Sequence, residues 1–76
     1  MITVKLYGLL RLDSGIKERQ LEATNVAQVL TFLENQGISH RSLSGTLILV
    51  NGESATKRTK LKDGDVVQFL PPVAGG

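Results

Sequence analysis

The sequence predicts a single α+β domain in which a mixed β-sheet carries one main helix on one face. Three patterns indicate this fold class: apolar residues alternate with polar ones at the start of the chain, recur at helical spacing in its middle, and return in short strand-like runs toward its end. With 76 residues, the chain is expected to form one small core with little room for an enclosed active site. Any chemistry is therefore expected at the surface, at a terminus or in the pocket of a partner.

The chain begins with a strand pattern in which every second residue is apolar, namely Ile2, Val4 and Leu6. This alternation is typical of a strand with one buried face. Residues 8–15 end in turn-forming residues and are expected to form a connection. A second strand is expected over residues 16–23, where the alternation is weaker.

The period then changes to that of a helix. Four apolar residues follow the spacing i, i+3, i+4 and i+7, namely Val26, Val29, Leu30 and Leu33. We predict a helix over residues 26–36. Asn25 and Gln28 have the spacing of a capping box at its start, and Gly37 is placed to end it in a left-handed conformation.

After this helix the pattern returns to strands. Residues 39–45 are polar and are expected to be irregular, whereas the apolar run 47–50 predicts a buried strand. Asn51-Gly52 follows this run and is a strong hairpin signal. A short return strand is expected over residues 53–55.

The last part of the chain contains a basic loop, a turn and a final strand. The loop is residues 56–62, the turn is Asp63-Gly64-Asp65, and the strand is residues 66–70. Pro71-Pro72 ends this strand, because proline cannot donate a hydrogen bond to a sheet.

The resulting order is strand, strand, helix, strand, short strand, strand, which is that of the β-grasp, or ubiquitin-like, fold. In this fold the first and last strands lie side by side in the middle of the sheet. We predict one β-grasp domain over residues 1–76, with residues 71–76 as a flexible C-terminal tail that leaves a central strand. The predicted core contains Ile2, Val4, Leu6, Val29, Leu30, Leu33, Leu47, Leu49, Val67 and Phe69.

Composition excludes several classes of function. The net charge of +2 and an aromatic content of 4% argue against a nucleic-acid partner. The absence of cysteine excludes disulfides and thiolate catalysis, and one histidine cannot build a zinc site alone. The sequence has neither an apolar run of the about 20 residues that span a bilayer nor a signal-peptide pattern. We therefore expect a cytoplasmic protein without a membrane partner or a bound metal.

Most polar clusters have simple structural interpretations. His40 lies in a polar stretch and is interpreted as a surface residue, and the acidic residues of the turn 63–65 as turn-forming. The basic residues Lys57, Arg58 and Lys60 are most simply a solvated hairpin face. The alternative is a docking patch, or a contribution to binding a phosphorylated substrate.

The end of the chain combines stiff prolines with small residues: Pro71, Pro72, Val73, Ala74, Gly75 and Gly76. The prolines favour an extended backbone, and glycine lacks a Cβ, so this segment fits a narrow channel into another protein's site. An ATP-using partner could convert the Gly76 carboxylate into an acyl adenylate. Attack by sulfide would then give a thiocarboxylate, and attack by an amine would give an amide. A frayed terminus without function is the alternative.

The run from Leu61 to Gly76, with its DGD turn, apolar strand and PPVAGG ending, resembles the C-terminal signature of the molybdopterin synthase small subunit (MoaD), in the ThiS–MoaD family of sulfur carriers. Four residues after the first strand also resemble family positions, namely Tyr7, Leu10, Arg11 and Gly15, whereas Gly8 and Leu12 depart from the family's usual residues there. Residues 50–53 resemble the family's central hairpin. The resemblance covers essentially the whole chain, but only its last part is specific.

This resemblance implies that an E1-like, MoeB-like enzyme adenylates Gly76 with ATP and that a sulfur donor then converts it to a thiocarboxylate. The chain would next dock on the large, MoaE-like synthase subunit, which supplies the catalytic side chains, and would donate sulfur to cyclic pyranopterin monophosphate. The expected tail is Val73, Ala74 and Gly75, the expected partner-binding residues are Phe69, Leu70, Pro71 and Pro72, and the chain itself binds no cofactor.

Other functions share the same features. A ThiS-like carrier for thiamine is similar, although the double proline favours the molybdenum pathway, and related carriers serve tungsten cofactor and other sulfur routes. A ubiquitin-like protein modifier would share the adenylation and end in an isopeptide bond. A β-grasp interaction module with a passive tail is a further alternative.

Overall fold

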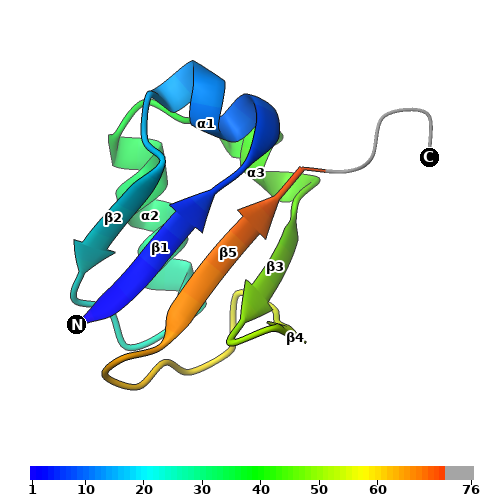
Figure 1. Ribbon diagram of the computed structural model, residues 1–76. Coiled ribbons are helices and arrows are strands. Elements are labelled where there is room, and N and C mark those ends of the chain that lie inside the picture. The colour runs from blue at the N-terminus through cyan, green and yellow to red at the C-terminus, as the bar shows by residue number, and fades with distance from the viewer. Residues whose placement is uncertain (72–76) are drawn as a thin grey trace.

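One five-stranded sheet and three helices make up residues 1–71, which are the residues that the computed structural model describes (Figure 1). In chain order the elements are β1 (Ile2–Leu6), α1 (Gly8–Ser14), β2 (Glu18–Leu21), α2 (Val26–Asn35), α3 (His40–Ser44), β3 (Leu47–Val50), β4 (Glu53–Ser54) and β5 (Val66–Leu70). In Figure 1, α2 and α3 lie behind the sheet, and the face of the sheet toward the viewer is uncovered.

The sheet has the strand order β2-β1-β5-β3-β4, so β5 is its central strand. It pairs in parallel with β1, where Leu6 lies opposite Phe69, and antiparallel with β3, where Leu47 lies opposite Leu70. This arrangement confirms the predicted β-grasp fold, with the first and last strands side by side. The chain therefore leaves the domain at the end of a strand that is held on both sides.

The main helix, α2, begins and ends at the predicted signals. The Asn25 side chain accepts a hydrogen bond from the N–H of Gln28, and the Gln28 side chain accepts one from the N–H of Thr24. The second bond reaches one residue further than in a standard capping box. At the other end, Gly37 has a φ of 97°. The N–H groups of Gly37 and Ile38 both donate to carbonyls of the last turn, as in a Schellman motif.

The core lies between α2 and the covered face of the sheet. Seven of the predicted core residues are buried: Ile2, Val4, Leu6, Val29, Leu33, Val67 and Phe69. Leu30 is half-buried and packs against this cluster.

The prediction was wrong for strand β3. Leu47 is 50% exposed and Leu49 is half-buried, whereas Ile48 and Val50 are the residues of this strand that pack against the core. Four consecutive apolar residues do not specify which face is buried, because alternation is what identifies the buried face. The pairing of β3 with β5 decides which face of β3 is buried, since Val50 lies opposite the buried Val67.

The two segments expected to be a connection and an irregular stretch instead contain the short helices α1 and α3. Each of these helices buries one leucine, Leu10 in α1 and Leu43 in α3. One buried residue in a short segment gives no readable period, and helices this short are not stable on their own. Their packing against the rest of the domain stabilises them, so the sequence pattern alone did not reveal them.

Candidate functional site

The candidate site is the place where the chain leaves β5. The predicted reactive residue, Gly76, and the predicted tail and partner-binding residues Pro72, Val73, Ala74 and Gly75 lie outside the described residues. The structure does describe the base of this segment, up to Pro71.

Three contacts fix the end of β5 to the residues that follow β1. The backbone N–H of Tyr7 donates to the carbonyl of Phe69 at 3.2 Å. The side-chain amide of Gln68 donates to the Tyr7 hydroxyl at 2.9 Å. The ring of Pro71 lies directly against Gly8, the first residue of α1. The junction between β1 and α1 therefore holds the base of the C-terminal segment on one side.

Residues of β5 alternate between the core and the open face of the sheet, as a strand requires. Phe69 is fully buried, so it can support a partner-binding surface only by holding β5 in the core. Leu70 is half-buried and points to the opposite face. It lies opposite Leu47, which is half-exposed. These two leucines place an apolar surface beside the exit of the chain.

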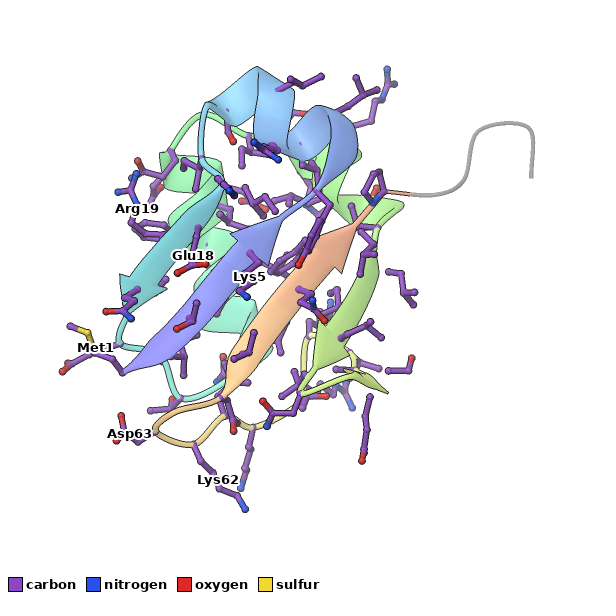
Figure 2. All side chains as sticks on the ribbon, viewed as in Figure 1. Met1, Lys5, Glu18, Arg19, Lys62 and Asp63 are labelled. Carbon is purple, nitrogen blue, oxygen red and sulfur yellow. The ribbon has the colours of Figure 1, made fainter. Side chains whose placement is uncertain are left out.

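The open face of the sheet extends this surface. Its apolar members are Tyr7, Leu47, Leu49, Val66 and Leu70, which are half-buried or exposed. Lys5 lies on the same face and pairs with Glu18 at 4.0 Å (Figure 2). We call these apolar residues the open-face patch. An apolar patch rimmed by charge is typical of a protein–protein contact.

Helix α1 adds two exposed leucines that the sequence reasoning did not assign. Leu9 and Leu12 are 67% and 74% exposed, whereas Leu10 between them is buried. Leu9 directly follows Gly8, the residue that lies against Pro71 at the base of the C-terminal segment. The signal in the sequence is the leucine-rich stretch 9–12, which lies within the predicted connection 8–15.

The basic residues lie in the loop that precedes β5, and Lys57 also lines a cavity with residues of α2, α3 and β3. Lys57, Arg58 and Lys60 are exposed and belong to the loop before β5. Figure 2 shows Lys62 and Asp63, also before β5, at the end of the sheet opposite the exit of the chain. The carbonyl of Lys57 accepts a hydrogen bond from the N–H of Ala27, in the first turn of α2. The backbone of this loop thus satisfies a free N–H at the start of a helix.

The acidic turn before β5 has a structural role, as the sequence suggested. The carboxylate of Asp65 accepts hydrogen bonds from the N–H of Lys62 at 2.8 Å and from the side-chain amide of Asn51 at 2.9 Å. These bonds, the one from Lys62 first, lower the pKa of Asp65 below its ordinary value of 3.8. Asn51 also accepts from the N–H of Val66, so this cluster ties the β3–β4 hairpin to the start of β5.

The structure describes the side chains of residues 1–71 except that of Asp13. Among these side chains, no group of three or more His, Cys, Asp or Glu residues could hold a metal ion. His40 pairs with Glu34 at 3.3 Å on the surface, beside a cavity of about 350 Å³ between α2, α3 and β3. None of the helices described is long and apolar enough to span a membrane.

Solved structures of similar fold come from several organisms. The solution structure of small archaeal modifier protein 1 from Methanosarcina acetivorans has a TM-score of 0.81 and 30% identity, over 99% of this chain and 95% of that one. A chain in the complex of subunits 1 and 2 of molybdopterin-converting factor from Helicobacter pylori 26695 has a TM-score of 0.76 and 26% identity, over 99% and 97%. A chain in the BexX/CysO complex from Amycolatopsis orientalis has a TM-score of 0.77 and 26% identity, over the full length of both chains.

Two of these three structures are complexes with another protein. No curated protein matches the chain. The ThiS family model matches residues 4–76, which includes both the described domain and the glycine-ended segment. The ubiquitin-like fold and this match together show that the chain belongs to the ThiS family of sulfur carriers.

Proposed function

We propose that this chain is the sulfur-carrying small subunit of a molybdopterin synthase. The observation that carries the proposal is the exit of the chain from the central strand β5, beside the open-face patch, into the sequence PPVAGG. A central strand gives the segment a fixed origin, and the patch gives a partner a surface to hold. The similarity to a chain in the molybdopterin-converting factor complex supports the choice of pathway.

In the proposed reaction, an E1-like, MoeB-like enzyme first binds the chain and ATP. A carboxylate oxygen of Gly76 attacks the α-phosphate of ATP, and pyrophosphate leaves. Sulfide, delivered by a sulfur donor, then attacks the acyl carbon, and AMP leaves. The product is a thiocarboxylate in which one sulfur replaces one oxygen. This activation is needed because a free carboxylate is a poor electrophile.

The loaded chain then docks on the large, MoaE-like subunit through the open-face patch and places Gly76 in that subunit's site. There the C–S bond of the thiocarboxylate breaks, its sulfur passes to cyclic pyranopterin monophosphate, and oxygen from water restores the Gly76 carboxylate. Two loaded chains supply the two sulfurs of the dithiolene. The partner supplies the catalytic side chains, and this chain supplies the sulfur and its delivery. Gly75 and Gly76 suit this role because a residue without Cβ leaves room in a narrow channel. The chain itself binds no cofactor in this scheme, and we place the reaction in the cytoplasm.

The protein-modifier function is the second candidate, because the chain is 30% identical to small archaeal modifier protein 1. It requires the same adenylate, but a lysine amine replaces sulfide as the nucleophile. The two functions therefore differ in what becomes of Gly76, and not in the fold.

Intact-protein mass spectrometry tests the proposal directly. The purified chain is incubated with the adenylating enzyme of the same organism, ATP and sulfide, and wild type should gain the mass difference of sulfur for oxygen. A variant lacking Gly76 serves as the control and should gain none. The same spectrum of protein isolated from cells shows whether the mature chain ends at Gly76. A lysine conjugate in those cells, without terminal sulfur, would favour the modifier function.

Complementation then tests the pathway. Expression in a bacterial strain without its own molybdopterin synthase small subunit should restore a molybdenum-enzyme activity, and expression in a strain without its thiamine sulfur carrier should not restore growth without thiamine. Wild type that rescues only the thiamine requirement would assign the chain to thiamine synthesis instead.

A further inference from the structure

Gly8 differs from the other glycines with positive φ in the described residues, which are Gly15, Gly37, Gly52 and Gly64. A Cβ added to any of those four would meet nothing within 4 Å. A Cβ added to Gly8 would lie 2.6 Å from Cγ and 3.4 Å from Cδ of Pro71. Gly8 is therefore required by close packing against the exit of the chain, in addition to its φ of 60°.

The two sides of this contact differ in how well they are fixed. The Gly8 side is held because Leu6 and Leu10, on either side of it, are buried in the core. The N–H of Tyr7 is also hydrogen-bonded to β5. Pro71, by contrast, is the first residue after β5 and belongs to no strand or helix. A larger residue at position 8 would therefore displace Pro71 and leave the β1–α1 junction in place.

A Cβ at position 8 would displace the ring of Pro71. The Cγ of Pro71 would have to recede by about 0.8 Å, from 2.6 Å to the 3.4 Å at which ordinary contacts begin. The proline ring is closed onto its own backbone, so it cannot rotate away as an open side chain would. A change of ring pucker takes up part of this displacement of Cγ, and the backbone at Pro71 takes up the rest. Pro72 follows and confines Pro71 to extended conformations, which limits other ways to absorb it.

We infer that Gly8 is a positioning residue. Because it has no Cβ, the ring of Pro71 can pack against it, and this contact sets the direction in which the C-terminal segment leaves the domain toward a partner's active site. This inference rests on the proposed sulfur-carrier function. The reaction at Gly76 depends on where its carboxylate lies, because a misplacement of about 1 Å at the reacting groups can cost about 100-fold in rate.

The test compares Gly8→Ala with Gly15→Ala, which is a matched control. Gly15 also has a positive φ, of 74°, but an added Cβ there meets open space. Both variants carry the strain of an L residue in this region, and only the first carries the clash. With the adenylating enzyme, ATP and sulfide, we expect kcat/KM for thiocarboxylate formation to fall by about tenfold in Gly8→Ala and by less than about twofold in Gly15→Ala.

Rescue by a second substitution separates positioning from a general loss of structure. Pro71→Ala removes the Cγ and Cδ atoms that the new Cβ would meet. In the Pro71→Ala background, Gly8→Ala should therefore change kcat/KM by less than about twofold. A nuclear Overhauser effect between the Gly8 α-protons and the Pro71 ring protons in wild type would confirm the contact independently of activity.

Equal rates for wild type and Gly8→Ala, or an effect of Gly8→Ala that persists in the Pro71→Ala background, would overturn the inference while leaving the sulfur-carrier function intact. Absence of the Overhauser effect would overturn the contact itself. If wild type gains no sulfur, the proposed function fails and the role of Gly8 in transfer fails with it.

Discussion

The open-face patch can be tested through Leu47, the residue that the sequence placed in the core and the structure places on the surface. Leu47 is 50% exposed beside the exit of the chain. Complete burial of a leucine is worth about 1.5–3 kcal/mol. A partner that covers the exposed half of Leu47 would therefore gain about 0.8–1.5 kcal/mol from it. Leu47→Ala should weaken the complex by about 4- to 13-fold.

Leu30 provides the matched control, because it is a leucine on the covered side of the sheet. It is half-buried against the core and lies on α2. Leu30→Ala should cost stability near the lower end of the about 2–5 kcal/mol seen for core leucines and should leave partner binding unchanged. Leu47→Ala should instead weaken partner binding and change the free energy of unfolding by no more than about 0.5 kcal/mol, as is usual for surface residues.

Two measurements check this pair of expectations. Urea unfolding gives the free energy of unfolding of each variant, and isothermal titration calorimetry gives its affinity for the adenylating enzyme and for the large synthase subunit. If Leu47→Ala destabilises the domain as much as Leu30→Ala does, the orientation of β3 is wrong. If Leu47→Ala binds both partners as wild type does, the open-face patch is not the docking surface.

Three other predictions concern the terminus, the acidic turn and the basic loop. Deleting Gly76, or adding one residue after it, should abolish sulfur loading without changing the free energy of unfolding, because one residue shifts the reacting carbon by up to about 3.3–3.6 Å; loading of either variant in the mass-spectrometric assay would contradict the proposed function. The pKa of Asp65 is lowered in the folded state from 3.8, so its contribution to stability is present above that pH and is lost as the pH falls below it. Urea unfolding between neutral and acid pH should show this loss in wild type and a smaller one in Asp65→Asn; identical pH profiles of the two proteins would show that Asp65 does not stabilise the fold. Neutralising Lys57, Arg58 and Lys60 together should slow association with the partners at low salt, and the difference should fade at high salt. An unchanged stopped-flow association rate at low salt would return these residues to the role of a solvated loop.

Local patterns were sufficient to predict most of the elements. The alternation at Ile2, Val4 and Leu6, the helical spacing from Val26 to Leu33 and the Asn51-Gly52 hairpin each come from neighbouring residues, and each was confirmed. The order of these elements then limited the topology to a β-grasp sheet with β1 beside β5. The glycine-ended segment was also evident in the sequence and is matched by the family model.

Helices α1 and α3 could not be predicted in the same way. Each buries a single leucine against the rest of the domain, so each depends on contacts with residues far away in the sequence. The same reason explains β3, whose four apolar residues fit either face until the register with β5 turns Ile48 and Val50 inward. Leu9 and Leu12 went unassigned because the helix that exposes them was not predicted.

By itself, the sequence determined the fold class, the family resemblance and the residues proposed to carry sulfur, because these depend on local periodicity and on a short motif. Only the tertiary structure decided which apolar residues are left for a partner and what holds the base of the C-terminal segment. The contact between Gly8 and Pro71 joins residues at opposite ends of the chain. The order of the elements predicted that β1 and β5 lie side by side, but it did not predict the register of this pairing. That register brings Gly8 against Pro71, and no local pattern in the sequence encodes it.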